Sequence, residues 1–442
     1  MLSREENELL TRVGPGTPFG NLMRRYWIPA LFSTHLPEPD GPPVRLKLLG
    51  ENLIAFRDTN GKVGLLEEHC AHRGASLFFG RNQECGLRCV YHGWKYDVMG
   101  QCVDMPNEPP ETSFADKIRV IAYPCREMGG VVWAYMGPAG TEPEFPELEW
   151  TLVPDSHRHL TRRWQETNWL QGVEGGFDPT HLAFLHRGTR EPGRPTREAI
   201  ARPSLAHTVA TGCGLMFANR RILGDGRDYW SVNQWMLPFH KLITRLGDDD
   251  PIGVHAWVPI DDENTMLLSI EYHPDRPLTE REHAAIVDWN FIHGETDPAT
   301  DRPVLNKAND YLIDRELQAN GGSFTGIKGI GTQDSAVQES MGAIYDRSQE
   351  HLGGSDAFIV TIREHLLQIL KDFESEGVLR ALDPTGYRVR SAGLFAPSGL
   401  SLEEAVGDAI VARVPATERS AAERSRKPTP VGLGRGGREM TR

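Results

Sequence analysis

Two short stretches of the chain each pair one cysteine with one histidine. CAHRG begins at Cys70 and includes His72, and CVYHGW begins at Cys89 and includes His92. Thiolates and imidazoles are the ligands that proteins use for zinc and for some iron–sulfur clusters. A zinc finger places two cysteines on one hairpin and two histidines on a helix. Here each loop supplies one ligand of each type, which favours a 2Fe–2S cluster with both cysteines on one iron and both histidines on the other.

A second set of candidate ligands lies in NWLQGVEGGFDPTHLAFLH at 168–186, which contains Asp178, His181 and His186. Two histidines and a carboxylate can hold a ferrous ion and leave positions open for O₂ and a substrate. On a regular α-helix, residues five apart point about 140° away from each other, so a short or distorted helix is needed to bring these rings together. The residues alone also allow a simpler interpretation. Asp178 before Pro179 is a good helix N-cap, and the histidines could be ordinary buried side chains.

Short β-like runs surround the first set of ligands. Between residues 26 and 137, apolar segments such as NLIAFRD and GGVVWAYM alternate with Gly, Pro and Asn turns, which is typical of an all-β domain. A helix is expected over 3–12, because Ser3 and Glu6 can form a capping box. The Pro- and Gly-rich stretch 137–150 marks a domain boundary.

The rest of the chain mixes strand-like segments, such as LMFANRRIL and YWSVNQWML, with helical ones. Helices are expected over about 279–292 and 356–376, the second with Ser355 as its cap and Gly377 as its end. Strands and helices without a β-α-β order indicate the α+β class, with an all-β N-terminal domain and a C-terminal antiparallel sheet with helices. The predicted divisions are an N-terminal helical segment 1–25, a β domain 26–140, a mixed domain 145–415 and a disordered, Arg-, Ser-, Pro- and Gly-rich tail 416–442.

Composition narrows the class of protein. The net charge of −13 argues against nucleic acid as the main partner. No apolar run approaches the roughly 18–20 residues of a membrane span, and the charged N-terminus lacks a signal-peptide core, so we expect a cytoplasmic protein with no membrane contact. Four of the six cysteines fall between residues 70 and 102, which favours a metal site over disulfides. Cys85 and Cys102, outside the two loops, are expected to be buried small apolar residues.

CAHRGA and CVYHGWKYD resemble the cluster motif of the Rieske family, and more narrowly its ring-hydroxylating branch. The respiratory branch adds a cysteine to each loop for a disulfide, whereas Ala75 and Val90 stand at those places here. The stretch from Asn168 to His186 is similar to the catalytic motif of Rieske non-haem iron oxygenases. Three further segments are similar to segments of phthalate 4,5-dioxygenase and its relatives: VGPGTPFGNLMRRYWIPA, VPIDDEN and QESMGAIYDRSQEHLGGSD.

The resemblance implies one Rieske 2Fe–2S cluster and one mononuclear non-haem Fe(II) per chain. The cluster ligands would be Cys70, His72, Cys89 and His92, and the iron ligands would be His181, His186 and a distal carboxylate.

The distal carboxylate of the family follows a glutamine on a late helix, which matches Gln333-Asp334. Asp334 is therefore the implied third ligand, although it could instead be a helix N-cap. Glu339 and Asp346 are the other carboxylates of that segment, and Asp346 beside Arg347 is expected to be a surface or salt-bridged residue.

The resemblance gives Asp178 a catalytic role as a link and not as a ligand. It would bridge His181 to a cluster histidine, His72 or His92, of a neighbouring subunit in a ring of three, which implies a homotrimer or a hexamer. Glu174 falls where some relatives have an asparagine near the iron, and both a structural and a functional role are open for it.

The implied function is that of the oxygenase component of a multicomponent system. A separate flavin and iron–sulfur reductase would pass electrons from NAD(P)H, and O₂ would be used to cis-dihydroxylate an aromatic carboxylate of the phthalate type. Monooxygenation, by O-demethylation or aryl-ether cleavage of a substrate such as phenoxybenzoate, is the alternative. A non-catalytic electron carrier or iron–sulfur sensor is a further alternative, which the intact second motif disfavours.

An anionic substrate needs a cationic anchor in its pocket. Arg220, Arg221 and Arg245 lie on strand-like segments and are candidates, although each could instead be solvent-facing or salt-bridged.

Overall fold

The structure, a computed structural model, describes residues 1–187, 204–244, 247, 249–288 and 292–412. The chain forms two compact units. One, here the β unit, comprises Arg12–Pro143 and Val258–Asp262. The other, here the mixed unit, comprises Met1–Thr11, Glu144–Trp257 and the chain from Glu263 onward. The tail predicted for 416–442 lies outside the described residues.

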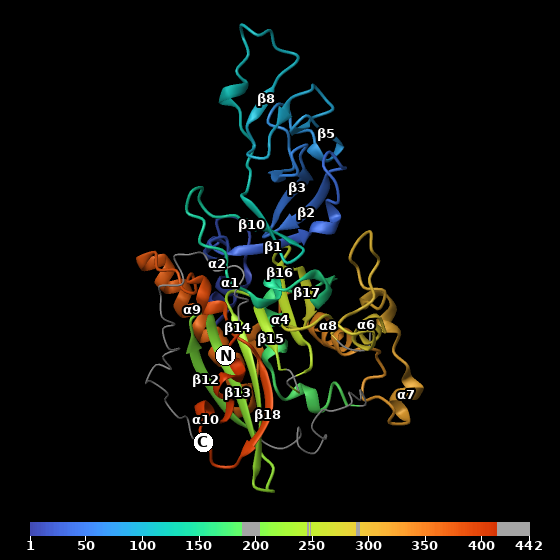
Figure 1. Cartoon of the computed structure of the whole chain (residues 1–442), viewed down its shortest axis with the longest axis vertical. Coiled ribbons are helices and arrows are strands. Elements are labelled where there is room, and N and C mark those ends of the chain that lie inside the picture. Colours follow the sequence, from blue (N-terminus) through green and yellow to red (C-terminus); the bar gives the residue numbers. More distant parts are fainter. Residues whose placement is uncertain (188–203, 245–246, 248, 289–291, 413–442) are drawn as a thin grey trace. The chain divides into compact units, whose positions relative to one another are not determined.

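The β unit contains three small antiparallel sheets within the described residues, in the strand orders β1-β10-β9, β2-β3-β4 and β5-β6-β7-β8 (Figure 1). The all-β character expected from the sequence is confirmed. Its elements are α2 (Pro18–Met23), β1 (Trp27–Phe32), β2 (Val44–Leu48), β3 (Glu51–Arg57), β4 (Val63–Glu67), the 3₁₀ turn η2 (Leu77–Phe79), β5 (Arg81–Gln83), β6 (Gly86–Arg88), β7 (Lys95–Tyr96), β8 (Cys102–Asp104), β9 (Cys125–Met128) and β10 (Val131–Tyr135).

The two extra cysteines of the β unit differ from each other. Cys102 is buried in a core that includes Phe56 and Trp94, as expected. Cys85 is only half-buried, so the prediction was wrong for this residue. It sits in the β5–β6 turn with φ of 59°, and its sulfur accepts a hydrogen bond from Asn60 Nδ2 at 3.1 Å.

The mixed unit is built on an antiparallel sheet. Within the described residues the sheet has eight strands in the order β11-β17-β16-β15-β14-β13-β12, with β18 also paired to β14 (Figure 1). The strands are β11 (Arg158–Gln165), β12 (Leu205–Thr211), β13 (Gly214–Ile222), β14 (Arg227–Met236), β15 (His240–Ile243), β16 (Ile252–Pro259), β17 (Thr265–Tyr272) and β18 (Ala392–Pro397). Helices accompany this sheet, which confirms the α+β class.

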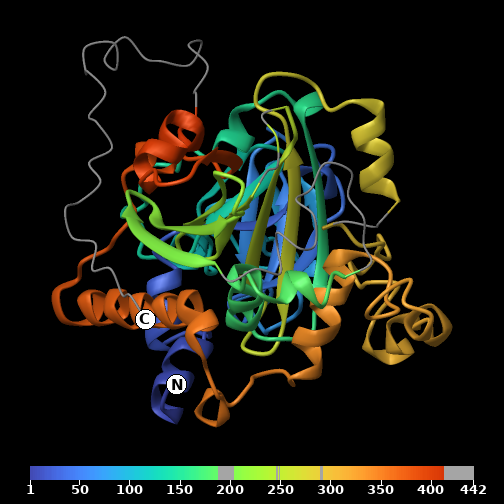
Figure 2. The same cartoon turned by 90° about the horizontal axis from the view of Figure 1, so that it is seen from below.

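The helices of the mixed unit include the long, straight α9, drawn in orange in Figure 2, which contacts α4. They are α1 (Arg4–Thr11), α3 (Glu149–Leu152), α4 (Trp169–Phe177), α6 (Glu280–Val287), α7 (Arg315–Ala319), α8 (Ile330–Ser340), α9 (Ala357–Glu376) and α10 (Leu402–Val406), with 3₁₀ turns η5 (His181–Ala183) and η6 (Lys307–Leu312) among them.

The N-terminal segment expected over 1–25 is divided between the two units. Helix α1 begins with the predicted capping box, in which Ser3 N donates to Glu6 at 2.8 Å and Glu6 N donates to Ser3 Oγ at 3.1 Å. It belongs to the mixed unit because the indole of Trp169 donates to Leu10 O at 3.1 Å. The following residues, with α2, belong to the β unit.

Two helix boundaries differ from the sequence expectation. Helix α6 covers Glu280–Val287, with Asp288 as its C-cap, and the expected stretch up to 292 includes residues 289–291, which lie outside the described residues. Asp356, and not Ser355, is the N-cap of α9, since a 3₁₀ turn over 354–356 precedes the helix. The expected end of α9 is correct, with Gly377 in the left-handed conformation at φ of 68°.

Candidate metal sites and substrate cavity

The segment after α4 places the two histidines of the second motif side by side. Asn168 is the N-cap of helix α4, and its side chain accepts from Leu170 N at 3.1 Å. It ends at Phe177, and Asp178 is the residue after its end, so the N-cap interpretation of Asp178 is wrong. The chain then forms a single 3₁₀ turn that starts at His181.

The 3₁₀ turn brings the two histidine rings together although they are five residues apart in the chain. Between His181 and His186 the backbone is not a continuous α-helix, and the ring centroids lie 5.0 Å apart at an interplanar angle of 81°. The predicted distortion is therefore present, and a straight helix would have separated the same rings.

Asp334 reaches this pair from α8. It is the fifth residue of that helix, so it is not an N-cap. Its Oδ1 lies 3.6 Å from His181 Nε2 and 3.3 Å from His186 Nε2. One donor atom of each of the three residues falls within 4.8 Å of the others. Ligand bonds of about 2.0–2.2 Å put donors on one face of an ion roughly 3–4 Å apart. The arrangement therefore fits one ion bound by two imidazoles and a carboxylate.

A glutamine orients the buried histidine of this cluster. Gln333 Oε1 lies 2.8 Å from His186 Nδ1, and Gln333 Nε2 donates to Ile327 O at 2.8 Å. The second bond directs the amide oxygen toward the ring, so Nδ1–H of His186 donates and Nε2 faces Asp334. Sequence reasoning used Gln333 only to locate Asp334 and missed this role. Its position next to the candidate ligand was the available signal.

Asp178 lies behind His181, on the side away from Asp334. Its Oδ2 is 3.6 Å from His181 Nδ1, and its Oδ1 accepts from the backbone N–H and the hydroxyl of Thr180, both at 2.7 Å. Burial raises the pKa of Asp178, but the neighbouring His181 and the Thr180 bonds outweigh burial and lower the pKa to about 2. The side chain is therefore a carboxylate at neutral pH, suited to orient His181.

The first motif forms two facing loops in the β unit. The N–H of Cys70 donates to Ala75 O at 2.9 Å, and the N–H of Cys89 donates to Trp94 O at 2.8 Å, so each loop is closed by a backbone bond. Both cysteines are 2% exposed, whereas the rings of His72 and His92 are half-buried with centroids 4.4 Å apart.

The surroundings of the cysteines also suit a cluster. Burial, opposed by backbone N–H groups of Tyr91 and His92 and reinforced by the nearby Cys70, raises the pKa of Cys89. The hydroxyl of Tyr96 lies 3.2 Å from Cys70 Sγ. Buried sulfurs beside hydrogen-bond donors, with two imidazoles facing them, fit the Rieske ligand pattern.

A cavity opens beside the His181, His186 and Asp334 cluster inside the mixed unit. Alternate residues of the sheet form its floor, because side chains of a strand point to opposite faces in turn. Among the described residues, those floor positions are Arg163, Gln165, Asn219, Arg221, Tyr229, Ser231, Asn233, Lys241, Ile243, His255, Trp257 and Leu267.

The three arginines proposed as substrate anchors have different outcomes. Arg220 pairs with Asp228 at 2.6 Å and does not line the cavity. Arg221, its neighbour on β13, lines the cavity and is 4% exposed. Arg245 lies outside the described residues.

Lys241 is a second cation of the cavity. Its ammonium donates to Gly176 O and lies 5.2 Å from the ring centroid of Phe177. Burial lowers the pKa of Lys241 to about 8, although the carboxylates of Asp334 and Asp178 oppose that shift.

The remaining acidic candidates have structural partners. Glu174 is 8% exposed and accepts hydrogen bonds from Arg347 and Arg363, which assigns it to a buried ion cluster. Glu339 accepts from the hydroxyl of Tyr311 and from the N–H of Glu166, the latter at 3.2 Å.

Asp346 is at the surface, as expected. It lies 3.5 Å from Arg4 and accepts from Ser348 Oγ at 2.6 Å.

Among the described helices, none is long and apolar enough to cross a membrane.

Comparison with known proteins assigns the chain to a family. The family described as "Rieske [2Fe-2S] domain" matches residues 26–124, and the one described as "LigXa C-terminal domain like" matches residues 134–392. The oxygenase subunit of 3-chlorobenzoate-3,4-dioxygenase from Comamonas testosteroni is 41% identical over 394 residues, covering 86% of this chain and 91% of its own. The oxygenase subunit of phthalate 4,5-dioxygenase from Pseudomonas putida is 38% identical, covering 85% and 88%.

A solved structure confirms the fold. The terminal oxygenase of carbazole 1,9a-dioxygenase from Nocardioides aromaticivorans IC177 is similar with a TM-score of 0.55 and 20% identity, over 83% of this chain and 97% of that one. The chain therefore belongs to the Rieske non-haem iron oxygenases, as the catalytic α subunit of an aromatic-oxidising system that uses a 2Fe–2S Rieske cluster, a mononuclear non-haem iron, O₂ and a separate reductase.

Proposed function

We propose that this enzyme cis-dihydroxylates an aromatic carboxylate, at an iron held by His181, His186 and Asp334. The observation that carries the proposal is the convergence of those three donors beside a cavity that also contains the cations Arg221 and Lys241. The relatives named above act, by their names, on 3-chlorobenzoate and on phthalate, and both substrates are aromatic carboxylates. Cys70, His72, Cys89 and His92 would hold the cluster.

When bound, the ferrous ion would supply the site of O₂ activation and the cluster would supply electrons singly. One ring double bond, one O₂, two electrons and two protons give one cis-diol, and the electrons come from NAD(P)H through the reductase. The protein residues hold the ring beside the iron. Gln333 keeps His186 in the tautomer whose Nε2 faces the metal. Apolar side chains such as Phe177 and Trp257 exclude water from the ring.

We propose further that Asp178 connects the two metal sites across subunits of a homotrimer or a pair of trimers. Its carboxylate lies beside His181 and is 22% exposed, so one side remains reachable for a cluster histidine, His72 or His92, of a neighbouring subunit. This geometry supports a linking role in preference to direct ligation, since His181 Nε2 and not Nδ1 faces Asp334.

Iron content tests the metal assignment. The wild-type chain should hold two cluster irons and one mononuclear iron, so a count of three. Asp334→Ala should hold two, with the visible absorption of the cluster unchanged, because a ligand of the mononuclear site alone is lost. Asp346→Ala is the matched control and should keep three. A wild-type count of two, or three irons retained in Asp334→Ala, would contradict the assignment.

Product analysis tests the reaction. With a reductase and NADH, we expect O₂ uptake to be stimulated by 3-chlorobenzoate or phthalate, and the product to be a cis-diol. Release of an aldehyde together with a phenol from an O-alkyl aryl ether would instead establish monooxygenation. Electron transfer to the cluster without any uptake in the presence of these acids would support the carrier or sensor alternative.

A further inference from the structure

Arg221 is a buried charge on the cavity face of β13. It is 4% exposed, and its Nη1 donates only a long bond, of 3.4 Å, to Ser231 Oγ. No carboxylate among the described residues pairs with it, and its buried Nε has no hydrogen-bond partner there. Burial lowers the pKa of Arg221, with only Tyr229 opposing that shift. Burying an arginine without an anion costs free energy, so the site is arranged for an anion that the described residues do not provide.

The residues around Arg221 form a polar wall of the cavity. In the antiparallel register of β13 and β14, Arg221 pairs with Tyr229 and Asn219 pairs with Ser231. All four side chains line the cavity. A planar guanidinium beside hydroxyl and amide groups matches the fork geometry of a carboxylate.

The neighbouring arginine shows that this placement is specific. Arg220 is adjacent in sequence and points to the other face, where Asp228 neutralises it at 2.6 Å. Its charge is therefore compensated within the chain. Arg221, on the cavity face, has no carboxylate partner among the described residues.

Arg221 and Lys241 lie on different strands of the cavity floor. Arg221 is on β13, and Lys241 is on β15, two strands away in the sheet. Strand spacing makes that separation about 9–10 Å. The charges of Asp334 and Asp178 act on Lys241, whereas the group that acts on Arg221 is Tyr229. Lys241 donates to Gly176 O, and Arg163, which also lines the cavity, donates to Ile292 O and Gly331 O. Arg221 is therefore the best placed of these three cations for a carboxylate.

Apolar side chains line the rest of the cavity. They include Phe177, Leu182, Ile243, Trp257 and Leu267. An aromatic ring bound by its carboxylate at Arg221 would rest on these residues, with the ring edge farthest from the carboxylate directed at the metal ligands.

We propose that Arg221 binds the substrate carboxylate, with Ser231 beside it, and thereby presents the ring carbons remote from that carboxylate to His181, His186 and Asp334. The inference rests on the proposed function and adds a specificity-determining residue and a regiochemistry to it. Oxidation then occurs at a pair of ring carbons such as 3 and 4 of a benzoate, and the carboxylate is retained. Addition of both oxygens at carbons 1 and 2 would require the carboxylate to face the metal.

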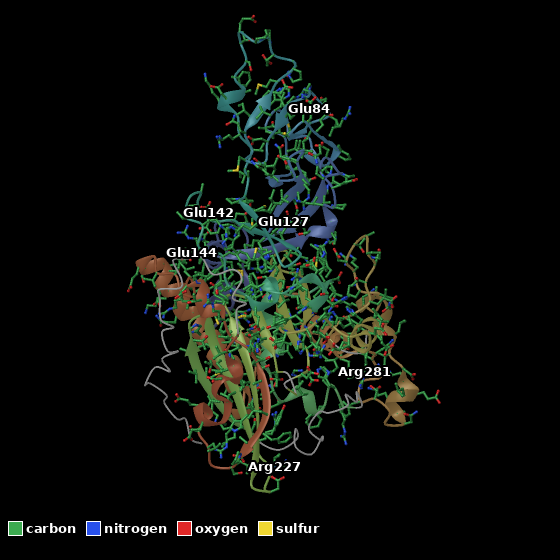
Figure 3. All side chains as sticks on the ribbon, in the orientation of Figure 1. Glu84, Glu127, Glu142, Glu144, Arg227 and Arg281 are labelled. Atoms are coloured by element: carbon green, nitrogen blue, oxygen red, sulfur yellow. The ribbon has the colours of Figure 1, made fainter. Side chains whose placement is uncertain are left out.

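Equilibrium binding of benzoate and of its uncharged analogue benzamide to the holoenzyme tests the anchor. We expect Arg221→Gln to weaken benzoate binding about 10- to 100-fold, because a hydrogen-bonded charge pair is lost, and to leave benzamide binding unchanged. Arg221→Lys should give a smaller loss, since a point charge replaces the fork. Arg227→Gln is the control. It removes an arginine at the exposed tip of the same hairpin, paired with Asp225 (Figure 3), and should bind both compounds like the wild type.

The proposal is overturned if Arg221→Gln binds benzoate as the wild type does, or loses benzoate and benzamide equally. If that variant does not fold, wild-type binding decides, because equal affinity for the two compounds would exclude a carboxylate anchor. The position of the two hydroxyl groups in the product decides the orientation. A 3,4-diol of the benzoate supports the proposed orientation, and a 1,2-diol, in which the carbon that carries the carboxylate has been oxidised, contradicts it. A wild-type iron count of two would overturn the proposed function but not the discrimination between benzoate and benzamide.

Discussion

Gln333 and His186 are 147 residues apart in the chain, and the amide oxygen of Gln333 lies 2.8 Å from Nδ1 of His186. The residue after Gln333 is Asp334, whose carboxylate faces the other nitrogen of the same ring at 3.3 Å. One turn of α8 therefore contacts both nitrogens of His186. Orientation of the ring and supply of the carboxylate are coupled in a single backbone segment.

Replacing Gln333 should weaken metal binding without removing a ligand. In Gln333→Ala, His186 loses the acceptor that fixes its tautomer, and we expect iron affinity to fall about 10- to 100-fold. Iron content after dialysis against a graded series of chelator concentrations measures the change, and the cluster absorption serves as the internal control. Gln368→Ala, which changes an exposed glutamine on α9, should match the wild type. Unchanged retention in Gln333→Ala would show that the contact is structural only.

Asp178→Asn should separate metal binding from electron transfer. The change keeps the shape of the side chain and the hydrogen bonds from Thr180 but removes the charge beside His181. We expect both metal sites to stay loaded while single-turnover transfer from the reduced cluster to the iron site slows by at least tenfold. Rapid-mixing absorbance at the cluster band follows the step.

Mixed oligomers test whether the transfer occurs between subunits. Co-expression of Cys89→Ser, which lacks a cluster ligand, with His186→Ala, which lacks an iron ligand, should give assemblies with partial activity, although each variant alone is inactive. No activity in verified mixed assemblies would argue that each chain uses its own cluster.

Glu174 should contribute to stability and not to chemistry. Its carboxylate accepts from Arg347 Nε at 2.8 Å and from Arg363 Nε at 2.6 Å, deep in the mixed unit. Glu174→Gln removes the negative charge that compensates these two buried guanidinium groups. We therefore expect the free energy of unfolding to fall by about 3–5 kcal/mol. Denaturant titration measures it. Asp346→Asn, which alters an exposed pair with Arg4, should cost at most about 1 kcal/mol.

His293 should make the fold sensitive to mild acid. The ring is fully buried with Nδ1 2.6 Å from Thr161 Oγ1, and burial, with the charges of His159, His255 and Arg163, holds its pKa well below 6.5. Below pH 6.5 the unfolded chain takes up a proton that the folded chain does not. The free energy of unfolding therefore decreases as the pH is lowered below 6.5, by up to about 1.4 kcal/mol per pH unit.

His293→Gln should flatten this dependence, as measured by urea titration at pH 7.5 and pH 5.5. His351→Gln, at an exposed histidine, should show the wild-type slope. An unchanged slope in His293→Gln would assign the acid sensitivity to other groups.

The candidate metal ligands stand out in the sequence because ligand chemistry restricts residue type and spacing together. Cys70 and His72 on one loop, and Cys89 and His92 on the other, are recognisable without a fold. His181 and His186 were less certain, since their five-residue spacing contradicts a regular helix until the 3₁₀ turn is known.

Long-range pairing could not be deduced in the same way. Nothing local shows that Glu174 meets Arg347, 173 residues away, or that Gln333 holds His186. Arg220 and Arg221 show the limit most clearly. Strand alternation requires them to face opposite sides, but which side is the cavity depends on packing that only the folded sheet defines.

Along β13 and β14, side chains that line the cavity alternate with side chains that pack in a hydrophobic core. The odd-numbered positions 219 and 221 of β13 and 229, 231 and 233 of β14 line the cavity. Met216, Ala218, Trp230 and Val232 form a hydrophobic core on the opposite face. Substitutions at the odd positions can thus alter which acids are oxidised while the even positions keep the hairpin folded. Residues that contact the substrate cavity and residues that stabilise the fold therefore alternate along the same two strands. Variant libraries limited to these five odd positions should remain largely folded while their substrates change.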